Sequence, residues 1–347
     1  MTHAPQRSAG QPVSDEYIRR LPKAEVHVHL EGSFEPSDVE QLARESGETL
    51  PRPVDELFDI AGLDLSAFLQ VLDWTCGLVR TREQLARAAY HLAAREKEAG
   101  AGYADVIVNP THWSPWRDRL DEFVDALDEG FMQAEVDGLP RIGVCVSLLR
   151  QQRASEAFEL VDWLLQRRHP RVVALSIDGN EAAAGRTGPR FAEAFQRAAD
   201  AGLHRTVHAG ESSGPEGVRD ALEFLLAERI DHGIRAVEDA DLVAELAERR
   251  IPLNVCPGSN VLLGAYPDRA SHPLEALRLA NVAVSINTDD PALMHLSLVS
   301  EYAESARTHG WDADVLRQVA RTSIQASFCD DDLRRRLLAA LDVMADA

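Results

Sequence analysis

The chain alternates short segments rich in β-branched residues with longer segments rich in Ala, Leu, Glu and Arg. Short runs of this kind, bounded by turn residues, predict strands. From the second run onward they begin 23 to 37 residues apart, the length of one strand–loop–helix unit. The eight predicted strands span residues 25–30, 104–109, 141–148, 172–178, 205–209, 229–232, 252–256 and 282–289. This alternation predicts a parallel sheet of the α/β class, and eight strands favour its closure into a (β/α)8 TIM barrel.

The gap between the first two predicted strands is much longer than one such unit. Their starts lie 79 residues apart, so we expect extra helices after the first strand, placed over the C-terminal mouth of the barrel. These helices are predicted at 36–46, 53–57, 65–79 and 82–99, and closing helices are predicted from residue 312 onward. No Gly/Ser/Pro linker or change in composition divides the chain. We therefore predict a disordered N-terminal tail, residues 1–14, followed by a single domain, residues 15–347.

Charge and residue usage exclude several classes of protein. A net charge of −21 disfavours nucleic acid and anionic lipid as partners, because both are themselves negatively charged. The first residues lack the apolar region of a signal peptide, and no run approaches the roughly 18 apolar residues of a membrane span. Four cysteines without a CxxC pair indicate free thiols in a reducing compartment. These features predict a cytoplasmic protein with neither a nucleic acid nor a membrane partner, and they leave its oligomeric state open.

Side chains suited to metal chemistry stand at the C-terminal ends of four predicted strands, where barrels carry their catalytic residues. In the first strand, His27 and His29 alternate with a valine, so both imidazoles point into the barrel. His208 lies in the fifth strand, His232 ends the sixth, and Asp289 ends the eighth. Each pattern alone has a structural explanation: a hydrogen-bonded pair of core histidines, a surface turn, or an Asx-turn leading into a helix. With 12 histidines in the chain, chance clustering also has to be weighed.

The four strand ends taken together favour a metal site over these separate explanations. The imidazoles of His27, His29 and His208 and the carboxylate of Asp289 form a set of ligands suited to Zn²⁺, with an open position for water. Bound Zn²⁺ lowers the pKa of water from roughly 15.7 to about 7, and Asp289 can also accept the water proton. Glu211, turned over the mouth by Gly210, and His232 would be acid–base groups beside the metal. To donate a proton, Glu211 needs a raised pKa, which a closed apolar pocket provides.

Four motifs resemble those of the adenosine deaminase family of metal-dependent hydrolases. They are PKAEVHVHLEG at 22–32, VHAGE at 207–211, RIDHG at 229–233 and SINTDDP at 285–291. They follow one another in the family's order, and the resemblance runs from about residue 20 to residue 330. It implies the (β/α)8 barrel, one Zn²⁺ per chain, a small-molecule purine as partner, and hydrolytic removal of the purine 6-amino group.

The resemblance also implies a role for each matching residue. His27, His29, His208 and Asp289 match the zinc ligands. Glu211 matches the proton donor to purine N1, and His232 matches the group that orients the attacking hydroxide, so that Glu211, His232 and Asp289 form the catalytic set. The residues expected to contact substrate are His29, Glu31, Gly179, Asp290 and Phe68: Asp290 at N7, the Gly179 amide at N3, Phe68 with Leu69 in an apolar lid, and Glu31 beyond the ring.

Departures from the family pattern concern the substrate. Family members that act on adenosine usually have Asp where this chain has Glu31, and Glu31 together with RIDHG at 229–233 looks more like the adenine (free base) deaminases. Gly179-Asn180 departs from the two serines, or Ser-Ala, usual in those enzymes, and Asn287-Thr288 looks more like the nucleoside enzymes. The motifs place adenosine slightly ahead of adenine and of aminodeoxyfutalosine, a bulky nucleoside of menaquinone biosynthesis. If Glu31 reads the sugar, Glu31→Ala should harm nucleosides and spare adenine. The structural alternative for Glu31 is a surface glutamate paired with an arginine.

Two other classes of function remain open at this point. One is a different metal amidohydrolase on the same barrel, such as an amidase or phosphotriesterase. Those enzymes often bridge two metals with a carboxylated lysine, but the early lysines, Lys23 and Lys97, do not end the fourth predicted strand, which favours a one-metal site. The other class is a binding protein without catalysis, against which stands the presence of every expected reactive residue.

Overall fold

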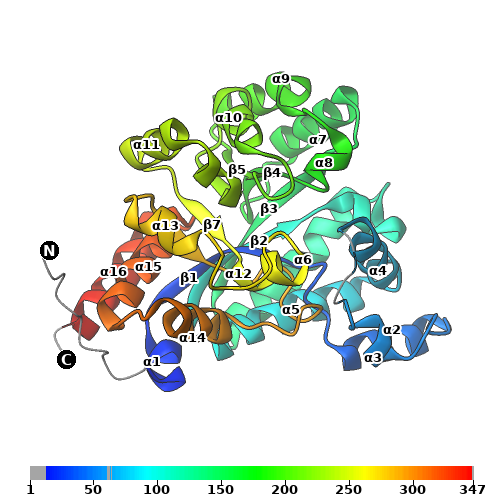
Figure 1. Ribbon diagram of the computed structural model, residues 1–347. Helices are drawn as coiled ribbons and strands as arrows, with labels where there is room; N and C mark the ends of the chain where they lie inside the picture. The colour runs from blue at the N-terminus through cyan, green and yellow to red at the C-terminus, as the bar shows by residue number, and fades with distance from the viewer. Residues whose placement is uncertain (1–12, 61–62, 64, 346–347) are drawn as a thin grey trace, which may run out of the picture.

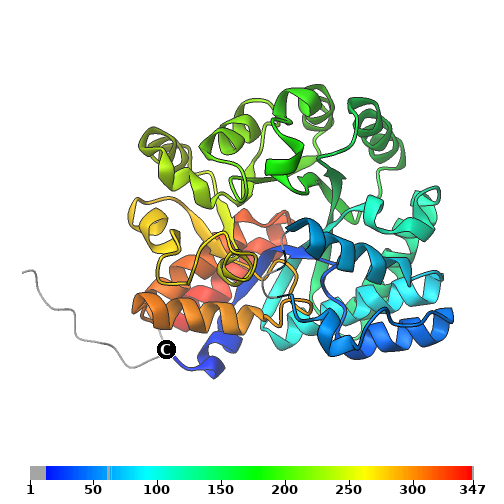
Figure 2. The same cartoon turned by 45° about the vertical axis from the view of Figure 1, so that its right-hand side comes forward.

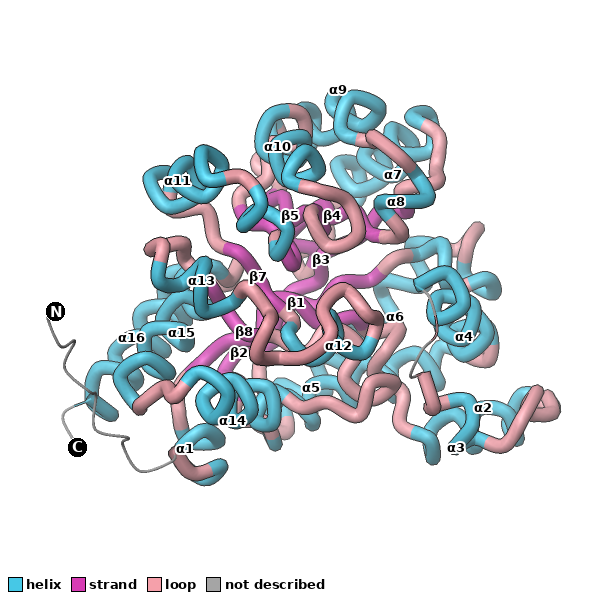
Figure 3. The backbone as a smooth tube through the Cα atoms, viewed as in Figure 1, coloured by secondary structure: helices cyan, strands magenta, loops and turns pink. Residues whose placement is uncertain are grey.

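The computed structural model describes residues 13–60, 63 and 65–345, and within them eight parallel strands form one sheet in the order β1 to β8. The strands are β1 (Lys23–His29), β2 (Ala101–Val108), β3 (Arg141–Leu149), β4 (Val172–Asp178), β5 (His204–Ala209), β6 (Arg229–His232), β7 (Leu253–Val255) and β8 (Val284–Ile286). The sheet closes between its first and last strands, where the His29 amide donates to the carbonyl of Asp289 at 2.7 Å. The Asp289 amide in turn donates to the carbonyl of His27 at 3.2 Å. The fold is the predicted TIM barrel, with its strands at the centre (Figure 1, Figure 3).

Helices surround the strands on all sides (Figure 3). They are α1 (Asp15–Arg20), α2 (Pro36–Ser46), α3 (Val54–Leu57), α4 (Leu65–Gly77), α5 (Arg82–Glu98), α6 (Leu120–Val136), α7 (Ala154–Arg167), α8 (Glu181–Ala184), α9 (Gly188–Asp200), α10 (Pro215–Glu223), α11 (Ala240–Arg249), α12 (Pro257–Leu262), α13 (Leu274–Leu279), α14 (Leu298–His309), α15 (Ala313–Ala326) and α16 (Asp331–Ala345). The four helices predicted after the first strand are α2 to α5, and the blue ones among them lie on one side of the barrel in Figure 2. The predicted closing helices are α15 and α16.

Local sequence explains why these helices form where they do. In α9, the buried residues Phe191, Ala194, Phe195 and Ala198 follow the spacing of one helical face, so this face packs on the barrel. At the start of α5, the Thr81 hydroxyl accepts from the Gln84 amide, and the Gln84 side chain accepts from the Thr81 amide. This reciprocal capping satisfies two backbone donors that the first turn of a helix leaves unpaired.

The last strand is shorter than the predicted segment 282–289, and the residue that follows it explains why. The side-chain oxygen of Asn287 accepts from the backbone amide of Val26 at 2.9 Å. A side chain thus takes the place of a backbone partner between β8 and β1, and the regular strand ends at Ile286. The residues that follow are released to turn into the barrel mouth.

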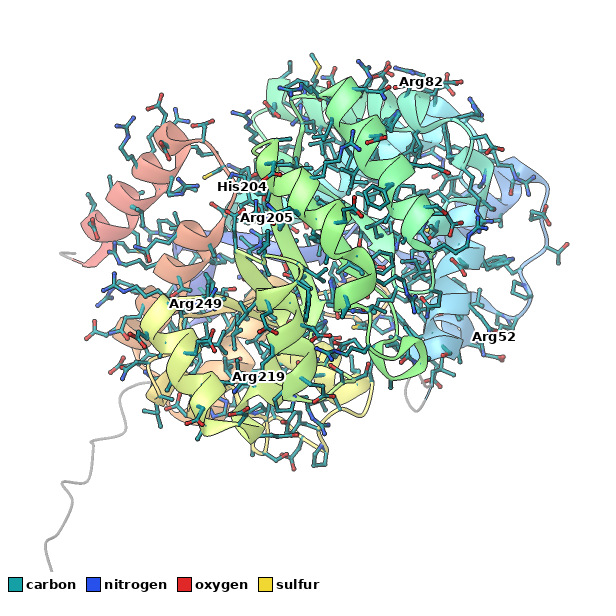
Figure 4. All side chains as sticks on the ribbon, turned by 90° about the horizontal axis from the view of Figure 1, so that it is seen from above. Arg52, Arg82, His204, Arg205, Arg219 and Arg249 are labelled. Carbon is teal, nitrogen blue, oxygen red and sulfur yellow. The ribbon has the colours of Figure 1, made fainter. Side chains whose placement is uncertain are left out.

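A buried ion pair joins Arg229, the first residue of β6, to Asp105 of β2. Arg229 is 1% exposed, and its guanidinium lies 2.5 Å from an Asp105 carboxylate oxygen and over the ring of Phe328. The same Asp105 oxygen accepts from the Phe328 amide at 2.9 Å. On the outer surface, arginines pair with acidic side chains, as Arg82 does with Glu129 on α6 (Figure 4 shows the surface around Arg82).

The described part of the chain begins with two residues before α1. Val13 packs against the core, and the Ser14 hydroxyl accepts from the Tyr17 amide as the cap of α1. Residues 1–12 of the predicted tail lie outside the described residues, so the division into a tail and one domain stays a prediction. In the described part of the chain, no helix is both long and apolar enough to cross a membrane.

Candidate metal centre and active site

The four predicted metal ligands meet at the barrel mouth. His27 and His29 end β1, His208 lies in β5, and Asp289 follows β8. The Nε2 atom of His208 lies 3.1 Å from the Nε2 atoms of both His27 and His29. The Asp289 Oδ1 atom lies 3.3 Å from Nε2 of His27 and 3.4 Å from Nε2 of His29. All four residues are buried.

A hydrogen bond on the far side of the His27 ring shows which of its nitrogens faces the cluster unprotonated when the ring is neutral. The Nδ1 atom of His27 lies 3.2 Å from the backbone oxygen of Asn254, which can only accept, so Nδ1 carries the proton. The Nδ1 atom of His208 has no hydrogen-bond partner and lies 3.5 Å from an Asp231 carboxylate oxygen. Nε2 of His27 therefore faces Nε2 of His208 and Oδ1 of Asp289, an arrangement that a bound cation would stabilise.

The dimensions of the cluster fit zinc. Nitrogen and oxygen ligands lie about 2.0–2.2 Å from a zinc ion, so atoms separated by 3.1 to 3.4 Å can bind the same ion. Burial lowers the pKa of His27, but the charges of Asp231 and Asp289 outweigh it and raise that pKa to about 9, so His27 has to lose a proton when it binds the ion. Burial and the three neighbouring imidazoles hold the pKa of His208 well below its usual range, so this ring stays neutral as a ligand must.

The backbone at Asp289 is held in an unusual conformation. Its φ is +71°, a left-handed value that is costly for a residue other than glycine. Two contacts support it: the Ser259 hydroxyl donates to Asp289 Oδ2 at 2.6 Å, and the preceding Thr288 donates to Glu25 through its amide at 2.7 Å and its hydroxyl at 2.6 Å. Ser259 and Glu25 lie outside the set of residues singled out from the sequence.

The two predicted acid–base groups lie together beside the cluster. Nε2 of His232 is 3.7 Å from Glu211 Oε1 and 3.8 Å from Asp289 Oδ2. Burial, followed by the charges of Asp289 and Glu181, raises the pKa of Glu211 to about 8, so Glu211 is protonated at neutral pH. Burial and His27 lower the pKa of His232 to about 4, so His232 is neutral. The protonation states are those of an acid and of a neutral hydrogen-bonding imidazole.

Glu181, which the sequence analysis did not single out, holds the loop that carries Glu211. Its carboxylate accepts from the backbone amides of Gly210, Glu211, Ser212 and Ser213 at 2.9 to 3.3 Å, and from the Ser213 hydroxyl at 2.7 Å. Burial alone would raise the pKa of Glu181, but the charge of Arg150 and these hydrogen bonds lower it. A glutamate two residues after the glycine of a strand-end motif was the only available signal.

A small pocket lies over the cluster, and it contains the predicted substrate-contacting residues. Its lining residues are His29, Glu31, Leu65, Phe68, Leu69, Leu72, His112, Asp178, Gly179, His208, Glu211, His232, Leu263, Asp289 and Asp290. Phe68 on α4 is 1% exposed and lines the pocket together with three leucines of the same helix. Gly179 has a φ of +95°, and Asn180 after it caps α8 by accepting from the Ala183 amide. Asn180, one of the departures from the family pattern, is thus a helix cap here. The roles of the lining residues stay predictions.

Glu31 is not the surface glutamate of the alternative explanation. It is 2% exposed, and in the described residues it forms no ion pair with an arginine. Its Oε1 atom accepts from the Asn109 amide and from the Trp113 indole, both at 2.7 Å, while Oε2 has no hydrogen-bond partner. Burial raises the pKa of Glu31 to about 7.

Two further carboxyl groups of the pocket resemble Glu31 in having one unpartnered oxygen. Asp290 Oδ1 and Asp178 Oδ2 are buried and accept no hydrogen bond. The Asn109 side chain donates to the other Asp178 oxygen at 2.6 Å, while its backbone amide binds Glu31, so Glu31 and Asp178 are neighbours. Burial and the charges of Asp289 and Glu31 raise the pKa of Asp290 well above its usual range. Asp178 and His112 are pocket residues that the sequence analysis did not identify.

Comparison with known proteins agrees with this geometry. The family described as adenosine deaminase matches residues 22–344. An adenine deaminase from Sinorhizobium fredii is 37% identical over 324 residues, which cover 93% of this chain and 99% of the relative. The crystal structure of an adenine deaminase from Arthrobacter aurescens has a TM-score of 0.88 and 29% identity, covering 94% of this chain and 100% of that one.

A second solved structure bears on the metal. It is an amidohydrolase from Burkholderia ambifaria with bound Zn, and it has a TM-score of 0.86 and 27% identity, covering 96% of this chain and 93% of that one. Matched by the family over nearly its whole length, and carrying the histidine–aspartate cluster at the mouth of the expected barrel, the chain belongs to the adenosine deaminase family and is a purine aminohydrolase.

Proposed function

We propose that the protein hydrolyses free adenine to hypoxanthine and ammonia, using one Zn²⁺ per chain. The sequence motifs placed adenosine slightly ahead of free adenine, and this proposal reverses that order. The change is supported by the relatives, which are named adenine deaminase and match over 93% of this chain. The observation that carries the proposal is the buried, unpartnered Oε2 atom of Glu31 in the pocket.

The carboxyl groups of the pocket match the edge of a purine that carries no sugar. With Asp290 at N7 and the Gly179 amide at N3, N9 lies between them on the purine edge. Glu31 shares Asn109 with Asp178, and its charge raises the pKa of Asp290. In adenine N9 carries a proton and donates a hydrogen bond, which Glu31 Oε2 accepts. In a nucleoside N9 carries ribose and has no proton, so the buried oxygen would lose its partner and the sugar would have to fit beside it. An unpaired buried acceptor costs about 1–3 kcal/mol.

The chain's own residues can carry out each proton movement of the reaction. The metal, when bound, supplies a water molecule acidic enough to react at neutral pH. Asp289 Oδ2 accepts a proton from the attacking water, and His232 holds the attacking oxygen by a hydrogen bond. Glu211 gives its proton to N1 as oxygen adds to C6. The C6–N bond then breaks, and the amino group leaves as ammonia with the proton that Asp289 received. The proton of the added hydroxyl group passes to the Glu211 carboxylate as the C6=O bond of hypoxanthine forms, which restores the acid.

The pocket also excludes water from the reaction. Phe68 and the leucines of α4 cover one side, and the ligand cluster forms the floor. Removal of water strengthens the hydrogen bonds to N1, N7 and N9, because charges interact more strongly at low dielectric.

The test compares adenine with 9-methyladenine, which is nearly as small but has no N9 proton. We expect kcat/KM for adenine to exceed that for 9-methyladenine by about 10- to 150-fold, since a hydrogen bond to a charged group contributes about 1.5–3 kcal/mol. In Glu31→Ala, which removes the acceptor and makes room for the methyl group, this ratio should fall toward one. Equal rates on both bases in the unaltered enzyme would contradict the role of Glu31. Adenosine and aminodeoxyfutalosine complete the panel, and preference for either would contradict the proposed substrate.

A further inference from the structure

A line of hydrogen bonds runs from the backbone behind the active site to His232. The Leu274 amide, at the start of α13, lies 3.2 Å from Nδ1 of His272. Nε2 of His272 lies 3.1 Å from the side-chain oxygen of Asn260 on α12. The Asn260 amide nitrogen lies 3.1 Å from Nδ1 of His232. Both intermediate side chains are buried, with Asn260 at 0% and His272 at 4% exposure.

The direction of each hydrogen bond follows from the first. A backbone N–H can only donate, so Nδ1 of His272 is an acceptor and carries no proton. The ring proton of His272 is then on Nε2, and it donates to the Asn260 oxygen. This contact fixes the orientation of the Asn260 amide, because its oxygen faces His272 and its nitrogen faces His232. The amide nitrogen donates to Nδ1 of His232, which leaves the His232 proton on Nε2.

We infer that Asn260 and His272 are positioning residues that hold His232 in the tautomer with its proton on Nε2, facing Glu211 and Asp289. This inference rests on the proposed function, in which His232 donates a hydrogen bond to the attacking oxygen. Neither residue contacts the reacting atoms, and both act through His232.

The opposite tautomer would have a clear chemical cost. With the proton on Nδ1, Nε2 would present a lone pair to Asp289 Oδ2 at 3.8 Å, to Glu211, and to the attacking oxygen. His232 would then accept where the reaction needs a donor. The ring cannot turn away from these groups. His232 is 1% exposed and ends β6 with a φ of +65°, so its side chain is enclosed by its neighbours. The tautomer therefore depends on the group that contacts Nδ1 of His232, and this group is the Asn260 amide.

The direct test is the tautomer itself, measured in the zinc-loaded enzyme. ¹⁵N-histidine labelling and two-bond ¹H–¹⁵N correlation spectra distinguish a protonated from an unprotonated ring nitrogen, and His232→Gln assigns the signal. We expect His232 with Nε2 protonated and Nδ1 unprotonated. A spectrum with Nδ1 protonated would overturn the inference whatever the enzyme's substrate proves to be.

Variants then test which residues set the tautomer. Asn260→Asp replaces the donor by an acceptor of the same shape, so Nδ1 of His232 should become protonated, and kcat should fall by about 10³- to 10⁴-fold, as for other histidines forced into the wrong tautomer. Zinc content should stay at one per chain. Retention of an unprotonated Nδ1 in Asn260→Asp would overturn the inference.

A matched pair at His272 tests the outer link. Gln places an amide nitrogen where His272 has Nε2 and keeps the donor, whereas Leu removes it. His272→Leu should free the Asn260 amide to turn, mix the two His232 tautomers, and lower kcat about tenfold with a smaller change in KM. His272→Gln should restore one tautomer and most of the rate. Equal loss in both variants, with one His232 tautomer in each, would mean that His272 serves folding only and would overturn its assigned role.

The same experiments separate this inference from the proposed function. If adenine is not the substrate, the rates change their meaning but the spectra still report the tautomer. If the spectra show the expected tautomer and its reversal in Asn260→Asp while kcat is unaffected, the role of His232 in the reaction is wrong, and with it the inference that the tautomer matters for catalysis.

Discussion

The role of each residue in this site depends on whether its side chain carries a proton, and Glu211 shows this most clearly. A carboxyl group donates a proton at neutral pH only if its pKa is raised, and burial with neighbouring negative charge raises that of Glu211 to about 8. Glu211→Gln should keep zinc and ligand binding but lower kcat by about 10²- to 10⁴-fold, because the amide has a similar shape and is not an acid. The exposed Glu223→Gln on α10 serves as control. A Glu211→Gln enzyme within tenfold of the unaltered rate would reduce Glu211 to a positioning role.

The pH dependence follows from the same raised pKa. A donor with its pKa near 8 is protonated below that pH and loses its proton above it, so kcat/KM should decline as the pH rises through about 8. The residual activity of Glu211→Gln should lack this decline, because the group responsible is gone. Profiles of kcat/KM between pH 6 and 10 for both proteins test the assignment, and an identical alkaline decline in both would contradict it.

Glu181 illustrates a residue that acts on its neighbour's position. Its carboxylate gathers four successive backbone amides, and a glutamine in its place would offer only one acceptor atom to them. We expect Glu181→Gln to lower kcat by roughly 10- to 100-fold with zinc retained. In the Glu211→Gln background the further loss should be less than threefold, since the two residues act as one unit. Independent, multiplying losses in this double-mutant cycle would show that Glu181 serves something other than the position of Glu211.

At the scale of elements, helix α4 closes the pocket with a single aromatic ring. Phe68→Ala should raise KM for adenine by about 5- to 150-fold, the range expected when a base loses its aromatic partner. The KM of Phe68→Leu, which keeps most of the apolar cover, should lie between those of the unaltered enzyme and of Phe68→Ala. Zinc content and circular dichroism report whether the barrel is intact. An unchanged KM in an intact Phe68→Ala protein would show that α4 does not contact the substrate.

The elements also show what the sequence predicted and what it did not. Strands β4 and β6 have the predicted bounds, and α2 begins and ends as predicted, because alternation, Pro36 and the left-handed Gly47 are local signals. The histidines of the cluster could be placed at the barrel mouth from the sequence because they lie on strands, where the period of two fixes their direction. Glu181, Asn260 and His272 were missed because their partners are 12 to 32 residues away along the chain, and such pairings exist only once the barrel has closed.

For the whole molecule, the barrel brings β1, β5 and β8 together, and the proposed zinc ion would join them. Zinc that binds only the folded state stabilises it, by about 4 kcal/mol at a thousandfold excess over Kd. We expect chelation to abolish deamination and to lower Tm, and zinc to restore both at one ion per chain. His208→Ala should lose most of the metal. Full activity in a preparation shown to be free of metal would contradict the zinc mechanism.

The central claim is that this barrel removes the amino group of free adenine. The direct measurement is kcat/KM for adenine and for adenosine with the zinc-loaded enzyme, followed by ammonia release under identical conditions. The carboxyl groups around N7 and N9 predict that adenine is preferred by at least tenfold. A kcat/KM for adenosine equal to or greater than that for adenine would contradict this account of the pocket.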